Sequence, residues 1–189
     1  MRIGFTGAGG TGKSTTLAIV VRMLEAFGMG VPVLGSVTRS VFQRRGLTEA
    51  DQESMSPEDR LNLQMEIFSE RRAAEKAIGG AFISDRTLVD HFAYCLFRNY
   101  AVIGDVDHTA LLDEAVESAA SYDALFYFPI SFTPPADGLR QAGVAYNYCI
   151  DAIISKVIDG VDGVMRVPDG TPLQRATAVF ERIRDVTGQ

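Results

Sequence analysis

Short apolar runs alternate along this chain with longer segments in which apolar residues recur every three or four positions. Side chains alternate faces along a strand and repeat every 3.6 residues on a helix, so this pattern predicts strands joined by helices. The apolar runs predict strands at residues 2–6, 31–34, 81–84, 123–128 and 163–167. The periodic segments predict helices at residues 13–27, 38–45, 57–78, 87–99, 109–120, 146–158 and 172–186, with an irregular stretch at 46–56. Such an order is typical of an α/β protein with a parallel sheet.

The composition is that of a globular protein, with 189 residues, 47% hydrophobic and 22% charged. This length predicts one domain over residues 1–189. No stretch approaches 18 consecutive apolar residues, which argues against a membrane span, and the N-terminus lacks the apolar core of a signal peptide. Cys95 and Cys149 have neither metal-ligand nor redox spacing, which favours free thiols and a cytoplasmic location.

A glycine-rich segment, Gly7–Ser14, fits the pattern G-x-x-x-x-G-K-[ST] and lies between the first predicted strand and helix. Its glycines allow successive backbone N–H groups to turn toward phosphate oxygens, and the following helix directs its positive end to the same anion. We expect Lys13 to reach the β- and γ-phosphates and the Ser14 hydroxyl to bind Mg²⁺. The predicted nucleotide-binding residues are Gly7, Gly9, Gly10, Thr11, Gly12, Lys13, Ser14 and Thr15.

A carboxylate and a guanidinium, Asp85 and Arg86, follow the third predicted strand. In phosphoryl-transfer proteins with a phosphate loop, an acid at such a strand end supports the metal or the attacking hydroxyl, which makes Asp85 a candidate metal-binding and catalytic residue. The alternative is that Asp85 only caps the next helix. Arg86 is expected to face substrate phosphates, or else to pair with Asp90 one turn further on.

The net charge of −6 argues against a broad nucleic-acid or anionic-membrane surface, although a local basic groove stays open. No acid occurs between residues 26 and 48, where Arg39, Arg44 and Arg45 lie. Arg39 follows the second predicted strand, at the edge where open α/β sheets bind ligands, and is a candidate to bind a phosphate or another planar anion. For Arg44 and Arg45 a solvated helix face is the favoured interpretation.

One face of the long predicted helix carries Arg60, Gln64 and Arg71, because positions 11 residues apart nearly coincide on a helix. A solvated stripe paired with nearby acids is the favoured interpretation, and a substrate-binding role is the alternative.

Residues 131–143 are rich in Pro and Gly and include Arg140, the sole arginine between Arg98 and Arg166. Kinases close a mobile segment over the γ-phosphate to exclude water. We therefore expect a lid at about residues 131–145, in which Arg140 stabilises charge on the transferred group. The alternative is a surface loop. The segment Gly170–Pro172 is expected either beside the nucleotide base or in a simple turn into the last helix.

The chain resembles the P-loop nucleoside and nucleotide kinases of the thymidylate-kinase-like branch, and most of all phage and bacterial relatives of the nicotinamide riboside kinase domain. The resemblance rests on the segments Gly7–Ser14, Ser36–Val41, Phe82–Phe97, Asp123–Ile130, Ala136–Arg140 and Val167–Arg175. It implies a three-layer P-loop NTPase fold with a five-stranded parallel sheet and a short lid. It also implies ATP and Mg²⁺, an Asp-Arg pair at Asp85 and Arg86, a lid arginine at Arg140 and, less directly, a role for Arg39.

The expected activity is ATP- and Mg²⁺-dependent phosphoryl transfer to a nucleoside, nucleotide or related hydroxyl acceptor. One phage branch of the family acts on 5-hydroxymethyldeoxyuridine in DNA, so a DNA kinase working in a host cytoplasm is one alternative. A P-loop ATPase or nucleotide-regulated binding module without kinase activity is another. Phe42, Tyr94 and Tyr127 are each candidates to stack on an acceptor ring or to fill the core. The absence of an Asn-Lys-x-Asp sequence argues against a GTPase.

Overall fold

A five-stranded, all-parallel sheet forms the centre of the protein in a computed structural model that describes residues 1–48, 50–102, 108–131 and 144–188. The strand order is β2-β3-β1-β4-β5, so β1 lies in the middle. The strands are β1 (Arg2–Thr6), β2 (Val33–Leu34), β3 (Phe82–Asp85), β4 (Ala124–Tyr127) and β5 (Val164–Arg166). Because all strands run the same way, the segments that leave β1, β3 and β4 lie next to one another at one edge.

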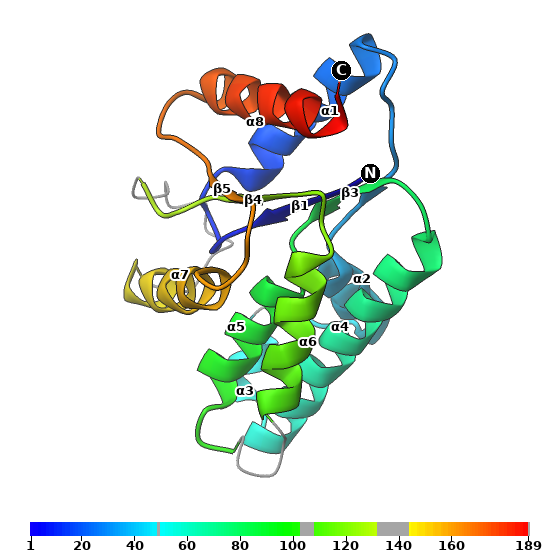
Figure 1. The fold of residues 1–189 in the computed structure, drawn as a ribbon. Helices are drawn as coiled ribbons and strands as arrows, with labels where there is room; N and C mark the ends of the chain where they lie inside the picture. The colour runs from blue at the N-terminus through cyan, green and yellow to red at the C-terminus, as the bar shows by residue number, and fades with distance from the viewer. Residues whose placement is uncertain (49, 103–107, 132–143, 189) are drawn as a thin grey trace.

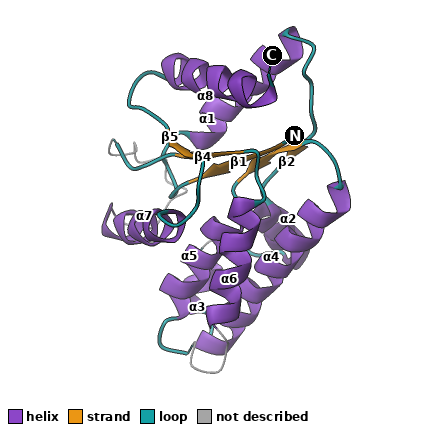
Figure 2. Ribbon diagram, in the orientation of Figure 1, coloured by secondary structure: helices purple, strands orange, loops and turns teal. Residues whose placement is uncertain are grey.

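Helices cover both faces of this sheet, giving three layers (Figure 1, Figure 2). α1 and α8 lie on one face, and the remaining helices lie on the other. The helices are α1 (Lys13–Ala26), α2 (Val37–Arg45), α3 (Asp51–Ser54), α4 (Pro57–Ile78), α5 (Leu88–Asn99), α6 (His108–Ala120), α7 (Val144–Ile158) and α8 (Pro172–Thr187). The three-layer P-loop NTPase fold with a five-stranded parallel sheet is confirmed.

Each face of the sheet has its own apolar core. Phe5 of β1 and Phe126 of β4 are fully buried in the core that includes residues of α1 and α8. Leu125 and Tyr127 of β4 belong to the opposite core, together with residues of α5, α6 and α7. Neighbouring residues of β4 thus serve two different cores, which explains why this strand is a continuous apolar run.

Two elements differ from the sequence prediction. The stretch 46–56, expected to be irregular, contains the short helix α3, which begins where the N–H and hydroxyl of Thr48 both donate to a carboxylate oxygen of Asp51. A single turn is too short to leave a periodic apolar pattern. The second strand is shorter than expected, because only Val33 and Leu34 of this edge segment pair with β3.

A buried ionic network joins α4 to the sheet and corrects the interpretation of Arg71. This side chain is fully buried rather than part of a solvated stripe. Its Nε lies 2.9 Å from Oε1 of Glu75, Nη1 donates to the carbonyl of Gly35 at 3.2 Å, and Nη2 donates to the carbonyl of Arg86. Glu75 also accepts from the hydroxyl of Tyr122 at 2.8 Å. Arg71 therefore ties together the segments that leave β2 and β3.

No helix in the described part of the chain is long and apolar enough to cross a membrane.

We predict that Arg71→Met destabilises the protein by about 3–5 kcal/mol, because it removes a buried ion-pair partner of Glu75 and the donors to two carbonyls. The free energy of unfolding in urea measures this loss. The matched control is Arg44→Met, which removes an exposed arginine paired with Glu66 and Glu70 and should cost about 0–1 kcal/mol. Equal losses for the two variants would contradict the structural role assigned to Arg71.

Candidate functional site

The loop between β1 and α1 is shaped to receive an anion. Gly7, Gly10 and Gly12 have φ angles of 144°, 79° and 82°, which favour glycine. A Cβ at Gly7 would lie 2.4 Å from the carbonyl oxygen of Phe128, so the loop passes too close to the end of β4 for any other residue. The first turn of α1 has no acidic residue and no side-chain cap, which leaves its N–H groups and positive end available.

The ammonium of Lys13 lies inside this loop. The side chain is 5% exposed, and Nζ donates to the carbonyls of Gly7 at 2.5 Å and Ala8 at 2.6 Å. Nζ also donates to the hydroxyl of Thr11 at 3.2 Å, the longest of the three bonds. Burial, followed by repulsion from Arg86, lowers the pKa of Lys13 from 10.5 to about 7. An anion in the loop would relieve this loss of solvation.

Ser14 and Asp85 lie together although they are 71 positions apart in sequence. The Ser14 hydroxyl donates to Oδ2 of Asp85 at 2.9 Å. The contact follows from strand order, because β1 pairs with β3 in a register that sets Phe5 opposite Asp85. A hydroxyl beside a carboxylate fits Mg²⁺, which takes hard oxygen ligands and usually keeps water and phosphate oxygens in its shell. Among the described residues no group of three or more His, Cys, Asp or Glu forms a metal site by itself.

Asp85 is not the cap of the following helix. Thr87 is the N-cap residue of α5 and forms a capping box with Asp90. The capping alternative for Asp85 is therefore wrong, and its carboxylate faces Ser14 instead.

Arg86 has a strained backbone with a φ of 82°, which is uncommon for a residue other than glycine. Three hydrogen bonds hold it. Its N–H donates to the carbonyl of Phe5 at 3.0 Å, and its carbonyl accepts from Ser84 Oγ at 2.9 Å and from Arg71. The guanidinium lies 3.3 Å from Asp90, so the predicted pairing is present, and it also lies over the ring of Tyr94 at 5.2 Å.

The sequence interpretation did not assign two residues that lie at the centre of the site. Asp90 was named only as a partner of Arg86, and Tyr94 was left between stacking on an acceptor ring and filling the core. Asp90 is fully buried and accepts from the N–H of Gly7 at 3.1 Å as well as from Thr87 and Arg86. Tyr94 is half-buried, and its hydroxyl accepts from the N–H of Gly9 at 3.1 Å. Their four-residue spacing on α5 places them on one helix face, which is the only signal the sequence holds. The other two aromatic candidates, Phe42 and Tyr127, are buried in apolar clusters.

The arginines of α2 separate into two kinds. Arg44 pairs with Glu66 and Glu70, and Arg45 pairs with Glu66, which confirms a solvated helix face paired with α4. Arg39 is exposed and has no ion pair within the described ranges. Its predicted anion-binding role therefore stays a prediction.

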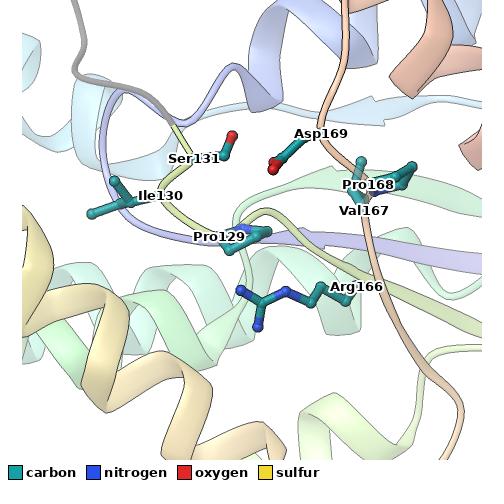
Figure 3. A pocket seen from close by; sticks show the side chains of 7 residues that line it. All are labelled: Pro129, Ile130, Ser131, Arg166, Val167, Pro168 and Asp169. Carbon is teal, nitrogen blue, oxygen red and sulfur yellow. The ribbon is translucent and has the colours of Figure 1, made fainter.

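A hollow of about 200 Å³ lies where β4 and β5 end. Figure 3 shows the side chains of Ser131 and Asp169 directed toward the same space, while Arg166 points away from them. Arg175, at the start of α8, is buried and donates to the carbonyl of Thr11 at 2.8 Å. The loop before α8 is therefore held against the phosphate loop, beside the hollow. Arg140 and the expected lid, apart from Ser131 and residues 144 and 145, lie outside the described residues.

Comparisons with known proteins bear on both family and fold. A family model described as an AAA domain, AAA_28, matches residues 2–172. No curated protein matches the sequence. The structure of NadR protein in complex with NR has a TM-score of 0.69 and 14% identity, over 100% of this chain and 52% of that chain. A second NadR structure, with NAD and AMP-PNP, has a TM-score of 0.62 and 14% identity, over 100% of this chain and 49% of that chain.

Deoxyadenosine kinase from M. mycoides with bound dCTP has a TM-score of 0.70 and 14% identity, over 98% of this chain and 100% of that chain. This chain spans about half the length of the NadR chains that it resembles. Likeness at this level of identity shows a shared fold.

We predict that ATP affinity falls as the pH rises from about 7 to 9, by up to roughly tenfold per pH unit. A bound triphosphate favours the charged ammonium, so binding raises the lowered pKa of Lys13 and takes up a proton. Calorimetry in buffers of different ionisation enthalpy measures that uptake. Lys13→Arg, which stays charged throughout, is the control for the proton equilibria of ATP itself. The same pH slope in both proteins would contradict the prediction.

Proposed function

We propose, from the premise that this chain belongs to the AAA_28 family of AAA domains, that it is an ATP- and Mg²⁺-dependent kinase. Its acceptor is a nucleoside, a nucleotide or a related hydroxyl compound. The observation that carries this proposal is the joining of Lys13, Ser14 and Asp85 at one phosphate loop. Likeness in fold to deoxyadenosine kinase and to NadR solved with AMP-PNP supports it. The finer assignment to the thymidylate-kinase-like branch is part of the proposal.

In this proposal the loop residues Gly7–Ser14 bind the triphosphate, with Thr15 beside them at the start of α1. Lys13 turns from the Thr11 hydroxyl, its longest contact, toward phosphate oxygens while it keeps the carbonyls of Gly7 and Ala8. Ser14 and Asp85 would hold Mg²⁺, which would supply charge neutralisation at the phosphates. The hollow at the ends of β4 and β5 lies beside the segment Gly170–Pro172, where we place the nucleotide base.

The transfer itself needs an acceptor hydroxyl near Asp85. The acceptor oxygen forms a bond to the γ-phosphorus while the bond from that phosphorus to the β–γ bridging oxygen breaks, and ADP leaves. Oδ2 of Asp85 accepts from Ser14, which leaves Oδ1 to take the hydroxyl proton. Arg86, held by Asp90 and Tyr94, is placed to bind phosphate oxygens in the transition state.

The alternatives receive less support. A DNA kinase requires a basic groove around residues 39–45, and acids of α4 neutralise two of its three arginines. A P-loop ATPase without an acceptor is less supported, because the proteins of similar fold include a deoxyadenosine kinase.

We predict that Asp85→Asn lowers the rate of phosphoryl transfer by about 10²–10⁴-fold, because it removes the charge and the proton acceptor. The fold should be kept, since Thr87 caps α5. The measurement is radiolabel transfer from [γ-³²P]ATP to a panel of nucleosides, nucleotides and hydroxymethylated DNA. Asp113→Asn, an exposed acid on α6, is the matched control. A folded, fully active Asp85→Asn protein would contradict the proposed role of Asp85. ATP hydrolysis without transfer to any acceptor would contradict the proposed kinase activity.

We also predict that Arg140→Ala lowers turnover more than it weakens ATP binding. A lid arginine meets charge that grows on the phosphoryl group only in the transition state, so its loss appears mainly in kcat. Steady-state kinetics with the acceptor found above measures this. Arg72→Ala, which removes an exposed partner of Glu114, is the control and should leave turnover unchanged. A loss confined to ATP affinity would remove Arg140 from the catalytic set.

A further inference from the structure

A cavity of about 350 Å³ lies on the helical side of the site, between α3, the start of α4, the end of α5 and α7. Its lining residues are Gln52, Glu53, Arg60, Phe97, Arg98 and Tyr146. The side chain of Tyr94 connects the cavity wall to the phosphate loop. The hydroxyl of Tyr94 accepts from the N–H of Gly9, and the rings of Tyr94 and Tyr146 are 6.2 Å apart.

Two arginines in this cavity are held in place by carbonyls and a hydroxyl, with no acidic partner among the described residues. Arg60 donates from Nε to the carbonyl of Gln52 at 3.0 Å and from Nη2 to the carbonyl of Met55 at 3.1 Å. Arg98 donates from Nε to the hydroxyl of Tyr146 at 2.6 Å. In the described part of the chain neither forms an ion pair, in contrast to the exposed arginines Arg45 and Arg72.

These contacts orient the guanidinium groups while leaving Nη1 of Arg60 and both Nη atoms of Arg98 without a hydrogen-bond acceptor among the described residues. A planar fork of donors held in advance binds an oxyanion at little entropic cost. Glu53 is the one acid in the lining, and it is exposed.

The walls of the cavity are aromatic. The rings of Phe97 and Tyr146 meet edge to face at 5.2 Å, and Phe97 is 38% exposed. The guanidinium of Arg98 also lies over the Tyr146 ring at 5.1 Å. An exposed aromatic beside fixed donors suits a planar ring with a polar substituent, because the ring covers the apolar wall while the substituent meets the donors.

We propose that this cavity binds the ring end of the phosphate acceptor, and that this ring carries a carboxylate held by Arg60 and Arg98. The inference rests on the proposed kinase function and narrows its substrate class to nucleosides whose ring carries a carboxylate. A neutral nucleoside would bring no counter-charge to the two arginines. Arg60 thereby takes the substrate role that was the less favoured interpretation of its helix stripe.

The test is calorimetric binding, without ATP, of matched pairs that differ in one anionic group. The carboxylate pairs are orotidine with uridine, and nicotinic acid riboside with nicotinamide riboside. In at least one pair the anionic member should bind about tenfold or more tightly, as expected for a charged hydrogen-bonded pair.

Arg98→Gln should reduce this preference to about twofold or less, whereas Glu53→Gln, which removes a negative charge from the same cavity, should leave or increase it. Arg60 also holds the backbone of α3, so Arg60→Lys is used, with thermal unfolding as a check of the fold. Tyr146→Phe keeps the ring and removes the hydroxyl that orients Arg98, and should weaken the preference partly.

Absence of preference in every pair, or a preference that Arg98→Gln does not change, would overturn the inference. Transfer from ATP is measured separately on the same compounds. Preferential binding with no transfer to any acceptor would overturn the kinase proposal and would leave in place only the anion-binding role of the cavity. Transfer to neutral nucleosides with no charge preference would overturn the cavity assignment alone.

Discussion

One fully buried carboxylate, that of Asp90, joins the phosphate loop to the segment after β3. A buried charge is tolerated only when donors surround it, and Asp90 has four: the N–H of Gly7, the N–H and hydroxyl of Thr87, and the guanidinium of Arg86. These donors come from the end of β1 and the start of α5. Satisfying this one side chain therefore fixes the loop, the beginning of α5 and Arg86 relative to one another.

The site holds its positive charge at a cost in stability that a bound anion would offset. Lys13 is buried with a lowered pKa, and Arg86 has a positive φ. A strained backbone such as that of Arg86 persists only where neighbouring contacts are strong enough to hold it. Arg71 supplies such contacts, because it donates to the carbonyls of Arg86 and Gly35. The same network therefore explains why α4 must carry a buried arginine at a position that looks like surface in a helical pattern.

How much the sequence predicts depends on whether a residue's role is local. The phosphate loop was predictable because its glycines are required by the backbone itself, and the start of α5 follows from the capping pair Thr87 and Asp90. The placement of Ser14 beside Asp85 required the strand order, which the sequence implies only through family resemblance. Contacts across helices left no such signal.

Arg60 and Arg71 make the limit of prediction concrete. They share one helix face and one residue type, so no periodicity separates them. Arg71 is buried because Glu75 and two carbonyls surround it, whereas Arg60 reaches a cavity because the short helix α3 folds back beside the start of α4. The difference lies entirely in what packs against each end of α4, which only the tertiary structure defines.

The arrangement of the arginines also explains how a chain with a negative net charge can attract anions at one place on its surface. With a net charge of −6 its average field repels phosphates, so attraction must be local. Acids of α4 and α6 pair with exposed arginines such as Arg44, Arg45 and Arg72 and cancel their field. Arg60 and Arg98 lack such pairing among the described residues and line one cavity. Pairing on the outside, together with arginines near the phosphate loop that have no acidic partner in the described part of the chain, confines positive potential to that side of the molecule.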